Sequence, residues 1–225
     1  MRYRIRWAKR GKLRFLSHHD EALVFERAAR RGGVPLDYSK GFSPHPKIAF
    51  GSGLPVGFGS EVELLDVGLT QPLATDELIA RFNQGLPEGL EVLAAVPLAP
   101  GAVSLGAVIM AADYLIATDA QWLDAGVAKF MSLTSYEIEK PYKGSTRVDD
   151  LRGGVLSAEV ADGRLEMRCA IKPRSVRPSD VLSAIAVLME EPEPAARFQR
   201  VALLTRVGEG FVLLDEHYQG SKVAS

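Results

Sequence analysis

Apolar and basic residues alternate along the first strand-like segment of the chain. The two kinds take opposite faces of residues 2–7: Tyr3, Ile5 and Trp7 on one, and Arg2, Arg4 and Arg6 on the other. A repeat of two is the pattern of a β-strand with one buried face. The sequence therefore predicts an amino-terminal strand whose three arginines line a polar face of a sheet.

A helix is predicted directly after this strand, from residue 18 to the Gly32-Gly33 pair, which ends it. Ser17 supplies the side-chain oxygen of an N-cap, and Asp20 follows three residues later, as in a variant of the capping box. The local pattern therefore fixes where this helix begins.

The order of elements then repeats along the two halves of the chain. Later segments are predicted to be extended at 61–69, 90–98, 113–118, 135–140, 200–207 and 210–216, helical at 75–82, 118–131 and 178–189, and a hairpin at 155–171, with a loop at 140–154. Apart from one additional extended segment, each half reads β-α-β-β-α-β, the ferredoxin-like order. We predict an α+β fold of two tandem ferredoxin-like domains, 1–105 and 106–225, with antiparallel sheets. A single continuous α+β domain is the alternative.

Composition places the chain among ordinary globular proteins, because 47% of its residues are apolar and 24% are charged. No apolar run reaches the roughly 18 residues of a membrane span, and the basic amino terminus lacks the apolar core of a signal peptide. The single cysteine, Cys169, excludes an internal disulfide. These features predict a cytoplasmic protein without a membrane partner.

Charge is distributed unevenly. Residues 1–60 contain 12 Lys and Arg against 4 Asp and Glu, and the rest of the chain contains 15 against 24. Such polarity predicts a localised surface that binds an anionic partner. The alternative is that the unlike charges of the two parts meet inside the fold.

The cations of this basic region are candidates for an RNA interface. They come from the predicted strand face, the predicted helix and the following loop, which also supplies one aromatic residue: Arg2, Arg4, Arg6, Arg27, Arg31, Lys47 and Phe42. On a 3.6-residue period, His19, Arg27 and Arg31 fall on one face of the helix. Such a row suits successive phosphates, and an exposed aromatic ring suits a base. Solvated surface charges are the alternative.

Three of the four histidines lie close together in sequence and are the candidate catalytic residues: His18, His19 and His45. The first two occupy the start of the helix, where the helix dipole favours the neutral imidazole of a general base or a metal ligand. With Asp20 they would give up to four ligands, but the spacing matches no recognised metal motif. We therefore predict no metal and no cofactor. Hydrogen bonds within the fold are the alternative role for these side chains.

Two segments, SHHD at residues 17–20 and YSKGFSPHP at residues 38–46, resemble the uncharacterised radical-SAM-linked protein family, which contains domain of unknown function 2344. DLRGGV and PSDVL in the second half also fit this family. The resemblance implies a radical-SAM partner protein and, through neighbouring ribonuclease genes, a connection with RNA. The chain has one cysteine, so it cannot supply the three thiolates of a radical-SAM cluster itself.

The amino-terminal part also resembles, less closely, the ferredoxin-like CRISPR repeat-processing endoribonucleases. These enzymes have a histidine near the first helix and use no metal, and the glycine-rich loop before their last strand is absent here. Three hypotheses follow: an RNA-binding accessory module for a radical-SAM RNA-modification enzyme or a ribonuclease, a metal-independent endoribonuclease with His18 or His19 as base, or a protein-interaction adaptor. Whether the chain is an enzyme stays open at this point, as does its oligomeric state.

Overall fold

The computed structural model describes residues 1–142 and 144–218, without the side chain of Tyr142. Two compact units make up the fold: the first contains Met1–Ile109 and the chain from Ala202 onward, and the second contains Met110–Val201. The domains predicted at 1–105 and 106–225 stay a prediction, and the last seven residues of the second lie outside the described part. Within that part, no helix is both long and apolar enough to cross a bilayer.

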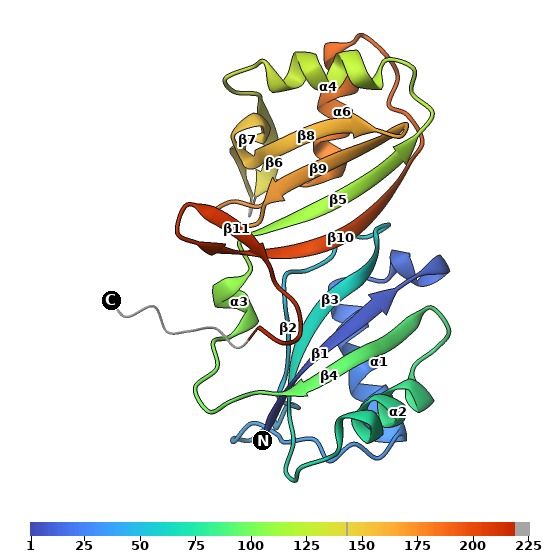
Figure 1. The fold of residues 1–225 in the computed structure, drawn as a ribbon, viewed down its shortest axis with the longest axis vertical. Coiled ribbons are helices and arrows are strands. Elements are labelled where there is room, and N and C mark those ends of the chain that lie inside the picture. Colours follow the sequence, from blue (N-terminus) through green and yellow to red (C-terminus); the bar gives the residue numbers. More distant parts are fainter. Residues whose placement is uncertain (143, 219–225) are drawn as a thin grey trace. The chain divides into compact units, whose positions relative to one another are not determined.

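Unit 1 is an antiparallel sheet with helices on one face (Figure 1). Its elements are β1 (Arg2–Lys9), the 3-10 turn η1 (Gly11–Phe15), α1 (His18–Arg31), β2 (Ile48–Phe50), β3 (Gly59–Gly68), α2 (Thr75–Gly85), β4 (Leu90–Pro97), α3 (Leu105–Val108), the later part of β10 (Ala196–Val207) and β11 (Gly210–Leu213). β1 pairs with β3 and β4, and β2 pairs with β3, all antiparallel. The predicted first strand and first helix are both present.

The core of unit 1 lies between this sheet and the two long helices. Ile5 and Trp7 of β1 pack in one buried cluster with Phe25 of α1 and Phe82 of α2. The helices approach so closely that a Cβ on Gly85 would lie 2.4 Å from the carbonyl oxygen of Ala28. Glycine is therefore required there by lack of space.

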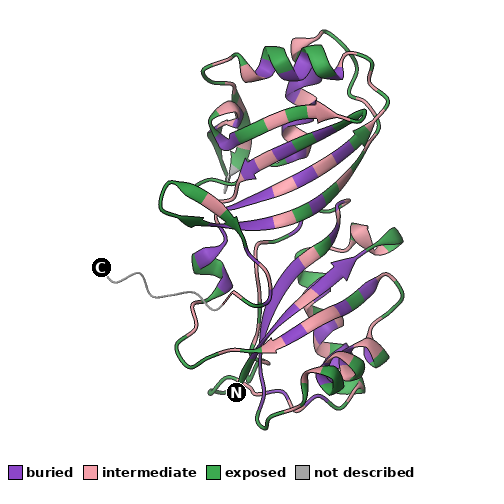
Figure 2. Ribbon diagram, in the orientation of Figure 1, coloured by how far each residue is buried: buried purple, intermediate pink, exposed green. Residues whose placement is uncertain are grey.

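The second face of this sheet is also covered, which the sequence did not predict. Arg4 is fully buried, and its guanidinium donates to Asp66 at 2.7 and 3.0 Å and to the backbone oxygens of Val103 and Tyr218. Figure 2 shows β1 buried along most of its length. The expectation of an open arginine face is thus wrong at Arg4, because other segments of unit 1 close over it. Alternation within one strand cannot show what packs on its polar side.

Unit 2 contains a three-stranded antiparallel sheet in the order β5-β9-β8, with β10 beside β5, and a separate hairpin. Its elements are β5 (Ala111–Thr118), α4 (Leu123–Met131), β6 (Glu137–Tyr142), β7 (Ser145–Asp150), α5 (Leu151–Gly154), β8 (Val155–Ala161), β9 (Arg164–Ala170), α6 (Pro178–Leu188) and the start of β10. The Asp162-Gly163 turn joins β8 and β9 with positive φ values of 50° and 70°, as two-residue hairpins require. The predicted hairpin is confirmed.

Two local predictions in unit 2 were wrong. Residues 145–150, expected in a loop, form β7 and pair with β6. STRVDD has one buried residue and no alternation of apolar side chains, so only its partner strand makes it a strand. The helix expected from residue 118 also begins later, because α4 begins at Leu123 and the Thr118 hydroxyl accepts a hydrogen bond from the Ala120 N–H. The predicted α+β class with antiparallel sheets is nevertheless confirmed.

Cys169 should be unreactive in the folded protein. Its side chain is buried in β9, and burial, with a smaller contribution from the negative charge of Asp113, raises the pKa of the thiol to about 12. At a pH of about 8.5, where an ordinary thiol is half ionised, a colorimetric disulfide reagent should label Cys169 only after denaturant is added. Rapid labelling of the native protein would contradict this burial.

Candidate functional site

The structure separates the three candidate histidines. His18 and His19 are exposed in the first turn of α1, where the Asp20 N–H donates to Ser17 Oγ as predicted. His45 is exposed in a loop that closes on itself, because its N–H donates to Ser39 Oγ and its carbonyl accepts from the Ser39 N–H. Within the described residues, no three His, Cys, Asp or Glu side chains are arranged to hold a metal ion.

A buried ion pair lies directly beneath His18. Lys9 Nζ donates to Glu21 Oε1 at 2.5 Å and to the Leu16 carbonyl oxygen at 2.8 Å. The two charged side chains are 0% and 1% exposed. The other carboxylate oxygen, Glu21 Oε2, lies 3.5 Å from Nδ1 of His18, whose side chain is 54% exposed. The exposed His18 imidazole therefore lies next to the Glu21 carboxylate, which a hydrogen bond from the buried Lys9 holds in place.

The groups around Glu21 shift the pKa of its carboxyl in opposite directions. Burial raises the pKa of the Glu21 carboxyl, and the negative charge of Glu63 adds to this, while Lys9 and His18 oppose it. A carboxylate oxygen beside Nδ1 favours the tautomer with the proton on Nδ1, which leaves Nε2 as an acceptor.

Aromatic side chains fix the position of the His18 ring. Its edge contacts Phe50 with a centroid distance of 5.4 Å, and Phe50 in turn packs against Phe25 and Trp7 at 5.5 and 6.0 Å. The buried Trp7 Nε1 has no hydrogen-bond partner in the part of the chain that the structure describes, so Trp7 supports the cluster through packing. A Cβ on Gly53 would lie 4.0 Å from His18 Cγ, so the loop between β2 and β3, the glycine-rich loop of residues 51–58, passes beside the imidazole.

Sequence reasoning missed Lys9 and Glu21, although a signal for both was present. Lys9 continues the odd-numbered series of Ile5 and Trp7, so β1 places it on the core face. Glu21 precedes the buried Phe25 by four residues, which places it on the buried face of α1. Opposite charges at two core-facing positions predict a buried ion pair.

The predicted helix stripe is exposed as expected. His19, Leu23, Arg27 and Arg31 are all exposed at successive turns of α1. The Arg31 guanidinium makes a long contact of 3.4 Å with the Gly85 carbonyl oxygen. This α1 face, defined by these four residues, therefore offers two arginines and an imidazole to solvent.

The remaining predicted cations are differently placed. Arg6 is bound to Glu216 at 2.9 Å, and Lys47 to Asp37 at 2.6 Å, where the ammonium lowers the pKa of the Asp37 carboxyl. Arg2 is exposed and donates to the Ala102 carbonyl oxygen. Arg6 and Lys47 are thus neutralised within unit 1, and Arg4 is buried. Phe42 is fully exposed, in the same loop as His45.

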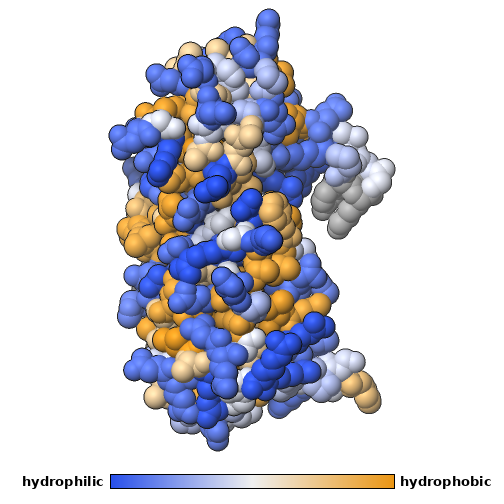
Figure 3. All heavy atoms as spheres, turned by 90° about the vertical axis from the view of Figure 1, so that its right-hand side faces the viewer, coloured by the Kyte–Doolittle hydropathy of each residue, from blue (hydrophilic) through white to orange (hydrophobic). Residues whose placement is uncertain are grey.

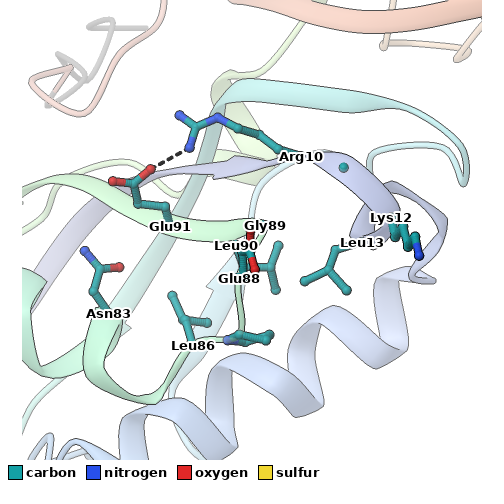
Figure 4. A pocket seen from close by; sticks show the side chains of 11 residues that line it. Arg10, Lys12, Leu13, Asn83, Leu86, Glu88, Gly89, Leu90 and Glu91 are labelled. Atoms are coloured by element: carbon teal, nitrogen blue, oxygen red, sulfur yellow. Dashed lines mark hydrogen bonds and ion pairs between the residues drawn. The ribbon is translucent and has the colours of Figure 1, made fainter.

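Two surface hollows lie in unit 1. One, of about 850 Å³, lies between η1 and the turn before β4. Figure 4 shows Arg10 turned toward Glu91 there, with Leu13 and Leu86 below them. The Arg10 guanidinium forms ion pairs with Glu61 and Glu91, so this hollow presents little positive charge to an anion. The other, of about 680 Å³, is lined by Arg2 and Lys47 together with apolar residues.

Hydropathy does not single out one binding surface on the face drawn in Figure 3, where apolar residues are interspersed among hydrophilic ones. The two units define a protein of mixed α and β structure with mostly antiparallel strands, and its most distinctive site is the buried ion pair beneath His18. A family model described as "Uncharacterized protein conserved in bacteria (DUF2344)" matches residues 2–180, and the protein belongs to this family.

Comparison with solved structures gives a limited likeness. A chain from the crystal structure of a Cbf5-Nop10-Gar1 complex matches with a TM-score of 0.46 and 11% identity, over 89% of this chain and 48% of that one. The protein thus spans about half the length of that chain, and a likeness at this level carries no argument about function. No curated protein matches the sequence.

Removal of Lys9 should destabilise the fold strongly. In Lys9→Met, Glu21 loses its counterion while it stays buried, which costs about 3–5 kcal/mol for a broken buried pair. The deficit relative to wild type should shrink as the pH falls. Burial raises the pKa of Glu21 in the folded protein, and Lys9, which opposes this rise, is missing in the variant. A carboxyl with a raised folded pKa contributes stability below its unfolded pKa and loses that contribution as the pH rises through the folded pKa, so protonation at low pH favours the variant more than wild type.

Urea unfolding at neutral and mildly acidic pH measures both effects. The control is Lys9→Met/Glu21→Leu, which removes both charges and should recover much of the lost stability. An equal loss in the single and double variants would show that packing of the lysine stem, and not its charge, is what stabilises unit 1.

Proposed function

We propose that the protein is an RNA-binding accessory module that acts beside a radical-SAM RNA-modification enzyme or a ribonuclease. The observation that carries the proposal is the α1 face, which presents His19, Arg27 and Arg31 to solvent in helical register. The basic turn before α1 adds Lys12 and Arg14. Cations spaced along a helix suit successive phosphates of a nucleic-acid backbone.

The revised interface differs from the sheet face expected from the sequence. Arg4 and Arg6 are committed to Asp66 and Glu216, so they do not serve as phosphate ligands in this proposal. Arg2, Lys47 and Phe42 form a second, more distant part of it, with Lys47 released from Asp37 when a phosphate binds. The radical-SAM partner is proposed from the resemblance of SHHD and YSKGFSPHP alone.

We also propose that both units are ferredoxin-like. In unit 1 the strand order β4-β1-β3-β2, all antiparallel, supports this, because β-α-β-β-α-β units fold in that order. In unit 2 the corresponding order is β10-β5-β9-β8, with the β6–β7 hairpin as an addition after α4.

Binding of single-stranded RNA should depend on salt and on the α1 face. Arg27→Gln/Arg31→Gln should weaken binding of an oligoribonucleotide and reduce the slope of log affinity against log salt by about 0.7 for each lost phosphate contact. Fluorescence anisotropy at several salt concentrations measures both quantities.

The matched control is Arg164→Gln/Arg197→Gln, which removes two exposed arginines from unit 2. It should leave affinity and slope nearly unchanged. If wild-type protein does not bind RNA even at low salt, the proposal fails. Co-purification with an acidic protein and without nucleic acid would instead support the adaptor role.

The site beneath His18 favours one second candidate, a metal-independent endoribonuclease. Glu21 and Lys9 would hold the imidazole so that Nε2 takes the proton of a ribose 2′-hydroxyl. The 2′-oxygen would then attack the adjacent phosphorus and displace the 5′-oxygen of the next nucleotide, which takes up a proton from water, to leave a 2′,3′-cyclic phosphate. A cation such as Arg14 would stabilise the negative charge that develops on the phosphate.

Cleavage assays with chelator present test this candidate. Wild type should cut structured RNA, His18→Ala should lose about 100-fold or more in rate, and Glu21→Gln should shift the pH dependence of the rate. His217→Ala, which removes an exposed histidine outside the candidate site, is the matched control and should retain activity. Absence of cleavage by wild type removes the enzyme hypothesis and leaves RNA binding to be decided by the anisotropy measurements.

A further inference from the structure

An exposed phenylalanine lies beside the His18 site, and its backbone is firmly held. Phe15 ends η1, and its side chain is 59% exposed. The Arg14 carbonyl oxygen before it accepts from the Gly57 N–H at 2.8 Å. The Leu16 carbonyl oxygen after it accepts from the buried Lys9 ammonium at 2.8 Å. The ring is therefore presented to solvent by a fixed segment, at the cost of the burial that a phenylalanine ordinarily gains.

A guanidinium already stacks on this ring. The Arg14 guanidinium carbon lies 4.6 Å from the centroid of the Phe15 ring, a cation–π distance. The pair thus combines an aromatic ring with a cation that lies over one of its faces, which leaves stacking of a base to the opposite face. One nucleotide contacts both groups when its base stacks on the ring and its phosphate binds the cation.

The loop of residues 51–58 passes close to both rings. A Cβ on Gly57 would lie 3.8 Å from Phe15 Cε1, and a Cβ on Gly53 would lie 4.0 Å from His18 Cγ. Gly57 also has a φ of +91°, which other residues rarely adopt. The loop therefore passes within van der Waals reach of Phe15 and His18 and carries no side chain at these two positions.

We propose that Phe15 and Arg14 form a stacking platform for one unpaired nucleobase, with the sugar of that nucleotide directed toward His18. The proposal rests on the proposed RNA-binding function and deepens it. Because every base has a π-face, the platform selects single-stranded RNA and tolerates sequence. It also gives the glycine-rich segment, which matches no nucleotide-binding motif, a physical role.

The experiment compares a single-stranded oligoribonucleotide with an abasic phosphodiester of the same length. Phe15→Leu should weaken binding of the oligoribonucleotide by about tenfold or more and leave binding of the abasic strand unchanged. Phe15→Trp should retain the affinity, and its added indole fluorescence should be quenched when bases bind. Val187→Ala, which shortens a highly exposed apolar side chain of unit 2 outside the proposed interface, is the control for loss of exposed apolar surface and should bind both strands as wild type does.

The other results of this experiment separate the stacking platform from RNA binding in general. If wild type binds RNA and Phe15→Leu binds both strands as wild type does, the platform is wrong and RNA binding stands. Equal losses for both strands show a general effect on the surface and also overturn stacking. If wild type binds neither strand, or if an acidic polypeptide displaces both strands equally, the stacking platform and the proposed RNA-binding function are both wrong.

Discussion

The buried pair of Lys9 and Glu21 is the interaction on which the candidate site depends. It joins the last residue of β1 to the first turn of α1, and the same ammonium binds the Leu16 carbonyl oxygen. Two charges taken out of water are stabilising only when each has its partner in good geometry. The strand end, the turn and the helix start must therefore form together, and the positions of His18 and Phe15 follow from that.

Unit 1 neutralises part of its amino-terminal positive charge with its own carboxylates. Arg4 is neutralised by Asp66 and Arg6 by Glu216, while Arg10 binds both Glu61 and Glu91. The basic amino-terminal region is thus partly explained by ion pairs inside the fold, the alternative left open by the sequence. The cations that stay on the surface gather on the turn before α1 and on the α1 face, which reduces the candidate interface to a small area.

Local signals in the sequence were sufficient for much of the fold. The alternation in residues 2–7, the Ser17 cap and the Asp162-Gly163 turn each depend on neighbours in sequence, and each was predictable. β7 was not, because its strand character comes from β6. The burial of Arg4 was not predictable either, since the groups that cover it lie about 60 to 200 residues away in the chain. For the site, the sequence alone indicated the histidines. Lys9 and Glu21 could be predicted only by comparing the core-facing positions of β1 with those of α1.

The return of the chain to unit 1 after unit 2 has a consequence for biosynthesis. Glu216 and the Tyr218 carbonyl oxygen, which bind Arg6 and Arg4, are translated only after all of Met110–Val201. While the ribosome makes unit 2, the sheet of unit 1 has one face uncovered and two arginines without part of their final partners. Nascent unit 1 is therefore incomplete until the residues after Val201 are made, although Asp66 and Val103 already bind Arg4 by then.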